Sequence, residues 1–178
     1  MEFLNPVTAW SSLQQFLSSG GPVLVAIMVL AFVLWAFILE RVAYYQMAHR
    51  PMLRRLKSEW AGREDKTSWM AHGIRDELIS EVKVKTGQNV DMIKTLVALA
   101  PLMGLLGTVT GMIEVFDTMA LSGSSSARLM AKGIFKATIP TMAGMTIALS
   151  ALFFPTYFER KGRRETARFA DEIGGLDA

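Results

Sequence analysis

Apolar residues gather in three stretches of this 178-residue chain, each long enough to cross a lipid bilayer as a helix. A bilayer core about 30 Å thick needs roughly 20 mostly apolar helical residues. The stretches cover residues 22–39, 95–113 and 137–158, and a glutamate directly follows each of them. Inside them there is no Asp, Glu, Lys, Arg or His. The pattern predicts an all-α membrane protein with three transmembrane helices.

The polar segments between these stretches carry helical patterns of their own. Apolar positions within residues 52–60 and 74–84 are spaced among charges, which predicts two amphipathic helices in the loop. We expect Pro51 to interrupt the helix that leaves the first span. After Asn89 no helix breaker occurs before Pro101, so the second span is expected to extend as a helix beyond the membrane, and the third likewise.

These elements divide the chain into seven segments, which set its orientation. In order they are an N-terminal segment (1–21), helix one (22–39), a loop (40–94), helix two (95–113), a turn with its flanks (114–136), helix three (137–158) and a tail (159–178). Lys and Arg number zero before residue 40, eleven in the loop, three in the turn segment and five in the tail. Basic residues concentrate on the cytoplasmic side, so the N-terminus is predicted to be outside and the loop and tail cytoplasmic.

The first span is predicted to be retained rather than cleaved. A signal peptide begins with basic residues, whereas the first basic residue here is Arg41, after the apolar run. The stretch LSGSSSA, residues 121–127, is small and polar and predicts a short external turn between helices two and three.

Composition and charge exclude several kinds of function. Hydrophobic residues make up 51% of the chain, and the formal net charge of +3 is explained by its cytoplasmic segments, so no nucleic-acid partner is expected. Cysteine is absent and the two histidines, His49 and His72, stand in different surroundings. Because catalytic zinc usually needs three protein ligands, no metal site is expected. No nucleotide-binding or catalytic motif is present, and we expect neither a cofactor nor an enzyme.

Small residues recur along one side of the second and third spans. Ala100, Gly104 and Thr108 follow one another at every fourth position. Gly107 and Gly111 form a separate pair, also four residues apart, on the neighbouring side of the helix. In the third span the stripe contains Ala137, Thr141, Gly144, Ala148 and Ala151. Small residues let helix backbones approach closely in lipid. We therefore expect helix packing at Ala100, Gly104, Gly107, Gly111, Gly144 and Ala148.

The polar residues within and next to these spans each allow two interpretations. Thr108 and Thr141 fall on the small-residue stripes, where their hydroxyls can line a passage or bond back to their own helix. Glu114 and Asp117, at the outer end of the second span, are candidate outer-mouth carboxylates or ordinary interfacial charges. Since proton relays need titratable groups at depth, a conducting assembly would take its membrane acid from another subunit.

The segment Ala100–Phe116, APLMGLLGTVTGMIEVF, resembles the signature of the MotA/TolQ/ExbB proton-channel family and is most similar to its ExbB branch. The third span, with Thr141 and Gly144, resembles the family's last span. The strong part of the resemblance covers roughly residues 90–165, while the earlier residues agree in layout.

The resemblance implies a multi-pass protein of the bacterial inner membrane, with a periplasmic N-terminus and a cytoplasmic C-terminus. It implies a homo-pentamer whose second and third spans surround an ExbD-like one-span protein, which supplies the intramembrane Asp. Proton flow would move this partner, and a TonB-like protein would pass the energy to outer-membrane receptors. Thr108 and Thr141 match the family's pore-lining threonines.

Two positions depart from the family pattern. Similar proteins have a glutamate at the start of the third span, where this chain has Lys136, and Pro140 replaces a small residue. A role of that glutamate therefore cannot be transferred, and the pore entrance is expected to differ in electrostatics.

Three alternative functions stay open. The chain resembles TolQ-like subunits of envelope-integrity motors, and a ring-forming scaffold that does not conduct would have the same helix pattern. Half of a secondary transporter is the third, but such proteins have broken helices near the bilayer midplane, whereas Pro101 and Pro140 lie near span ends.

Overall fold

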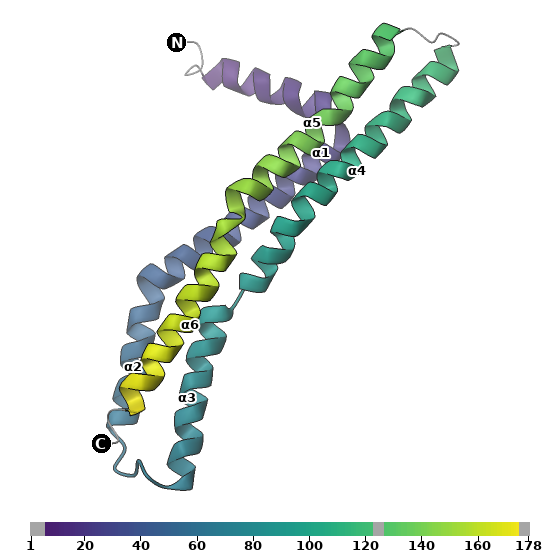
Figure 1. Cartoon of the computed structure of the whole chain (residues 1–178). Coiled ribbons are helices and arrows are strands. Elements are labelled where there is room, and N and C mark those ends of the chain that lie inside the picture. The colour runs from purple at the N-terminus through teal and green to yellow at the C-terminus, as the bar shows by residue number, and fades with distance from the viewer. Residues whose placement is uncertain (1–5, 123–126, 175–178) are drawn as a thin grey trace. The chain divides into compact units, whose positions relative to one another are not determined.

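The computed structural model describes residues 6–122 and 127–174, and the regular structure in these ranges is helical throughout (Figure 1). The helices are α1 (Pro6–Ala43), the π-helical turn η2 (Tyr44–Ala48), α2 (His49–Ala61), α3 (Trp69–Gly87), α4 (Val90–Ser122), α5 (Ala127–Ala151) and α6 (Phe153–Gly174). Three helical stretches are long and apolar enough to cross a membrane: Gly20–Ala61, Trp69–Leu121 and Gly133–Gly174. The predicted all-α fold with three apolar helices is confirmed.

The helix boundaries refine the predicted ones. Both amphipathic helices of the loop are present as α2 and α3, and α4 begins at Val90, five residues before the predicted second span. The third predicted span is divided between α5 and α6 at Leu152. Pro155 lacks the N–H that the carbonyl of Ala151 would accept in a continuous helix, which explains the turn there. Residues 123–126 of the predicted external turn lie outside the described residues, as do 1–5 and 175–178.

Pro51 does not end the helix that leaves the first span. Pro51 lies in the first turn of α2, and the π-helical turn η2 lies immediately before α2. Because proline removes the hydrogen bond to the carbonyl four residues earlier, a wider turn at this point keeps the chain helical. The predicted interruption is therefore a local change of helix type.

The chain forms two compact units, which we describe separately. The apolar unit comprises Met1–Leu34 and Thr95–Ala151, and the charged unit comprises Trp35–Lys94 and Leu152–Ala178. In the apolar unit, α1 changes direction at Gly21, whose φ of 68° lies in the left-handed region that favours glycine, just before Pro22. Figure 1 shows the first part of α1 turned away from the rest of the helix at this point.

The apolar unit has a narrow buried core and a wide exposed apolar surface. Leu24, Ile27 and Leu34 of α1 are fully buried at helical spacing. Large apolar side chains elsewhere in the unit are exposed, among them Phe32 and Leu149. A soluble monomer rarely exposes this much contiguous apolar surface, whereas lipid or neighbouring subunits cover it in a membrane protein.

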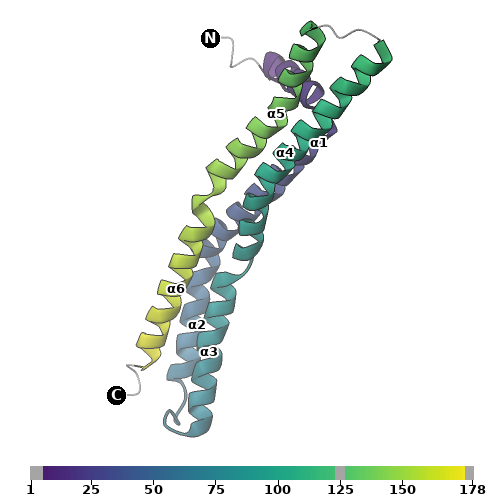
Figure 2. The same ribbon diagram turned by 45° about the vertical axis from the view of Figure 1, so that its right-hand side comes forward.

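The charged unit has a conventional hydrophobic core among α2, α3 and α6, which run side by side in both views (Figures 1 and 2). Its buried members are Leu56, Trp60, Ala71, Leu78, Val82, Phe169 and Ile173. Leu56, Trp60, Leu78 and Val82 lie in the two segments whose spaced apolar residues predict amphipathic helices, and Phe169 and Ile173 come from α6.

Arg41 fixes the point where α3 ends and α4 begins. Its buried guanidinium donates two hydrogen bonds, of 3.1 and 2.9 Å, to the carbonyl of Lys85 in the last turn of α3. A cation at a helix C-terminus is favourable because the last carbonyls lack partners within the helix. Asn89 then takes a left-handed conformation, with φ 63°, and its side chain donates to Glu40 at 3.2 Å. These contacts hold the start of α4.

Candidate functional site

The contact between α4 and α5 in the apolar unit brings together most of the small residues that the sequence singled out. A Cβ added at Gly144 would overlap the carbonyl oxygen of Ala100. One added at Gly104 would lie 2.9 Å from the Cα of Thr141. The two backbones therefore meet directly, and neither glycine leaves room for a side chain.

The same contact continues towards the C-terminal end of α4. A Cβ on Gly107 would overlap the ring of Pro140, and one on Gly111 would lie 2.7 Å from the Cβ of Ala137. The residues of α4 that face α5 are thus Ala100, Gly104, Gly107 and Gly111. These residues are separated by four, three and four positions, which keeps them on one side of a helix with 3.6 residues per turn. A series of residues separated by four positions each would move gradually around the helix. The two patterns that the sequence analysis separated form one contact face.

Thr141 lies inside this contact and connects the two helices. Its hydroxyl donates a 2.8 Å hydrogen bond to the carbonyl of Gly104 in α4. Thr108 lies one residue beyond the contact face, and its hydroxyl donates to the carbonyl of Leu105 in its own helix at 2.7 Å. Both threonines are half-buried. The structure therefore places the two hydroxyls in different settings.

Other polar residues of the spans bond locally or face outward. The hydroxyls of Thr110, Thr138 and Thr146 donate to carbonyls of their own helices. Ala148 is half-buried further along α5, and Asp117 is exposed on α4. None of these side chains forms part of the contact at Gly104 and Thr141.

Glu114 and Lys136 form an ion pair between α4 and α5. The ammonium of Lys136 lies 3.0 and 3.3 Å from the two carboxylate oxygens of Glu114. The sequence analysis treated these residues separately and did not predict the pair. The signal was present, because each residue lies one position outside its predicted span, on either side of the same turn segment.

The charged unit contains further polar contacts that sequence patterns did not indicate. Buried Tyr45 in η2 donates to the carbonyls of Thr86 and Phe158, at 3.3 and 3.5 Å. Burial raises the pKa of Tyr45 to about 12, against the opposing effect of the nearby Arg41 cation. Buried His49 has Nε2 3.3 Å from a carboxylate oxygen of Glu165. These contacts connect η2 and α2 to α6.

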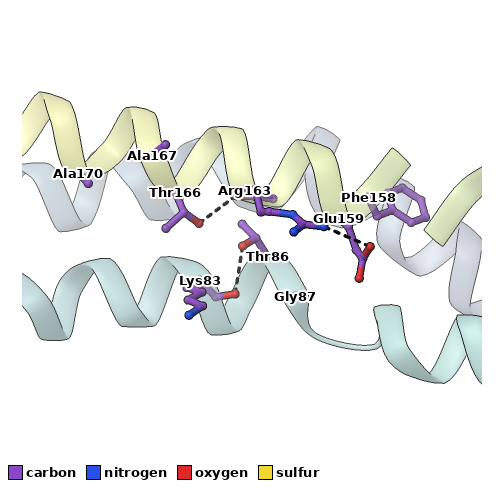
Figure 3. A pocket seen from close by; sticks show the side chains of 10 residues that line it. Lys83, Thr86, Gly87, Phe158, Glu159, Arg163, Thr166, Ala167 and Ala170 are labelled. Carbon is purple, nitrogen blue, oxygen red and sulfur yellow. Dashed lines mark hydrogen bonds and ion pairs between the residues drawn. The ribbon is translucent and has the colours of Figure 1, made fainter. Parts of the chain in front are cut away.

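Lys94 and Glu159 form an ion pair where α4 meets α6 in this unit. Their hydrogen bond raises the pKa of Lys94 and lowers that of Glu159, which also feels the Arg163 cation. Glu159 lines a groove of about 580 Å³ between α3 and α6, together with small residues such as Gly162 and Ala167 (Figure 3). Figure 3 shows its carboxylate directed towards Arg163. Glu159 is the one carboxylate among the described residues that line this groove, and it already pairs with Lys94 and Arg163. The groove therefore lacks the set of oxygen ligands that a metal ion needs.

Among the residues that the structure describes, no three His, Cys, Asp or Glu side chains lie where they could hold a metal ion. The apolar unit instead offers two helices in close contact, two hydroxyls and an ion pair at one end. That arrangement suits contact with another membrane helix.

Fold and site define an integral membrane protein whose apolar helices pack through small residues, with no ionisable side chain in residues 22–39, 95–113 and 137–158. The profile of the MotA/TolQ/ExbB proton channel family matches residues 38–171, most of the chain, and the chain belongs to this family.

Relatives with reviewed descriptions are of the ExbB kind. The chain is 48% identical over 64 residues to a proposed biopolymer transport protein of Synechocystis, ExbB-like 1, a match of 34% of this chain and 25% of that one. It is 28% identical over 88 residues to ExbB-like 3 of the same organism, covering 48% and 42%. The biopolymer transport protein ExbB of Xanthomonas campestris is 28% identical over 93 residues, covering 52% and 37%. The chain thus matches less than half the length of each of these three relatives.

Proposed function

We propose that the chain is an ExbB-like subunit of a proton-driven motor in a bacterial inner membrane. With an ExbD-like one-span partner, it would energise TonB-dependent transport across the outer membrane. The observation that carries this proposal is the α4–α5 contact, which contains small residues and Thr141, has Thr108 beside it, and has no acid within the spans. A proton path through such helices needs a partner's carboxylate.

The proposed assembly is a ring of five copies with the partner helix at its centre. The N-terminus lies in the periplasm, and the long loop and the tail lie in the cytoplasm, as the distribution of Lys and Arg supports. The exposed apolar surface of the apolar unit offers area for lipid, for neighbouring copies and for the partner helix.

The threonine hydroxyls suit a membrane acid that gains and loses a proton. Thr108 and Thr141 each donate to a backbone carbonyl, so their oxygen lone pairs stay available as acceptors. A protonated carboxyl of the partner can donate to them. When it ionises, either hydroxyl can turn and donate to the carboxylate instead. The threonines would thereby lower the cost of charging an acid in an apolar pore.

The test replaces both threonines by valine, which removes the hydroxyls and keeps the shape nearly constant. Thr108→Val with Thr141→Val should still purify with the one-span partner but abolish proton-driven uptake. Thr141→Val alone should cost about 1 kcal/mol of stability, because it also removes the bond to Gly104. Thr138→Val with Thr146→Val is the matched control and should have a milder effect, since both hydroxyls bond within their own helix and lie outside the contact at Gly104 and Thr141.

Three outcomes separate the alternatives. Normal uptake by the double variant would show that the hydroxyls are structural. Recovery of a one-span partner whose loss impairs envelope integrity but not uptake would assign the TolQ-like role. A stable ring without any partner bearing a membrane Asp would favour the scaffold.

A further inference from the structure

The ion pair between Glu114 and Lys136 closes one end of the α4–α5 contact. Lys136 directly precedes Ala137, which packs against Gly111, and Glu114 follows Gly111 by three residues on α4. In the proposed orientation this is the outer, periplasmic end. The pair therefore stands where the small-residue contact opens towards the outside.

Two hollows of the apolar unit meet at this pair and share Gly111, Glu114 and Lys136. One, of about 270 Å³, lies between α4 and α5 and extends outward past Val115 and Gly133. The other, of about 210 Å³, lies between the kink of α1 at Gly20–Val23 and the two helices, and reaches inward to Thr110 and Gly107. Both exceed by far the 10–15 Å³ that one water needs on this measure.

The inner hollow has the polar groups that water requires. Pro140 has no N–H, so the carbonyl of Lys136 loses its usual partner within α5. Glu114, Lys136 and Thr110 are among the residues that line this hollow. A buried water is held by two to four polar partners, and these residues can supply them. The two hollows therefore offer room for water on both sides of the ion pair.

Glu114 is better placed between these hollows than Asp117. Its side chain is 63% exposed while the side chain of Lys136 is 39% exposed, so water reaches the carboxylate while the cation holds it in place. Asp117 is exposed on α4 and lines neither hollow. The part of α1 in this unit that the structure describes has no charged residue, and the other cations of α5, Arg128 and Lys132, come earlier in the helix.

We infer that Glu114, positioned by Lys136, is the carboxylate that takes up protons at the outer end of the path, and that the two hollows carry the water on either side of it. This inference rests on the proposed function. A proton from outside water binds a carboxylate oxygen of Glu114 and then leaves to water in the inner hollow. The role of Lys136 is to position this carboxylate.

The test measures proton-driven transport against outer pH, with the chain purified together with its one-span partner and returned to vesicles. Glu114→Gln should lower transport at least tenfold at every pH. Lys136→Gln should lower the maximal rate by less than Glu114→Gln does, because it keeps the carboxylate and removes only the cation that positions it. Lys136→Arg should behave as the wild type, and Arg128→Gln, the matched loss of a cation on α5, should leave transport unchanged.

Equal losses in Glu114→Gln and Lys136→Gln would show that the pair only ties two helices together, and would overturn the inference. Full activity of Glu114→Gln would also overturn it. If Glu114→Gln does not assemble, infrared difference spectra between acid and neutral outer pH should show a protonated-carboxyl band that Glu114→Asp shifts. An unshifted band rejects the inference. A wild-type complex that transports nothing would instead contradict the proposed function.

Discussion

At the residue scale, the α4–α5 contact allows a sharp comparison between two glycines. A Cβ on Gly144 would overlap the backbone of Ala100, whereas one on Gly73 in α3 would meet nothing within 4 Å. We expect Gly144→Ala to destabilise the protein by about 1–3 kcal/mol, the usual cost of overpacking. Gly73→Ala should stabilise it by about 0.5–1 kcal/mol, since alanine is the better helix former. Thermal unfolding in detergent measures both, and equal effects would contradict the close approach of the helices.

Tyr45 gives a pH-dependent prediction. Its pKa is about 12 in the folded protein, above the ordinary value of 10, because burial disfavours the phenolate. The folded state therefore keeps this proton longer than the unfolded state. The resulting stability is complete below pH 10 and is lost as the pH rises towards 12, by about 3 kcal/mol at most.

Replacing Tyr45 by phenylalanine should remove most of this fall in unfolding free energy between pH 10 and 12. Tyr157→Phe, a change at an exposed side chain, should leave it in place. Denaturant unfolding at several pH values provides the measurement. A Tyr45→Phe variant that loses stability as steeply as the wild type would show that another group is responsible.

At the element scale, the start of α3 depends on one side chain. Ser68 is the N-cap, and its hydroxyl accepts a 3.1 Å hydrogen bond from the backbone N–H of Ala71. Ser68→Ala should lower the unfolding free energy by about 1 kcal/mol. Ser58→Ala is the control and should change it by less than 0.5 kcal/mol, because that exposed hydroxyl donates within its own helix. A larger effect at Ser58 than at Ser68 would contradict the capping role.

The helices could be predicted from sequence patterns, whereas their contacts could not. Length and hydropathy predicted the helices, and the spaced apolar residues predicted α2 and α3, because both signals depend only on local periodicity. The combined face of Gly104, Gly107 and Gly111 was missed because it depends on which side of α4 meets α5. Glu114 and Lys136 are 22 residues apart in the chain, and their pairing depends on the register of α4 against α5. Tertiary packing decides both.

At the scale of the whole molecule, the apolar unit and the charged unit differ in how each is stabilised. The charged unit has a buried core of its own among three helices. The apolar unit instead exposes much of its apolar surface, which lipid or other membrane helices must cover. This difference supports the proposal of a subunit that works within a larger membrane assembly.

In the proposed assembly the chain provides the channel wall and a partner provides the acid. Proton flux into proteoliposomes, followed with an internal pH-sensitive dye under an imposed pH gradient, is the measurement that decides this division of roles. We expect no flux above empty vesicles for the chain alone and clear flux when it is reconstituted with the one-span partner with which it purifies. Replacing that partner's membrane Asp by Asn should abolish the flux. Conduction by the chain alone, or by the complex with the Asn variant, would show that the acid does not come from the partner.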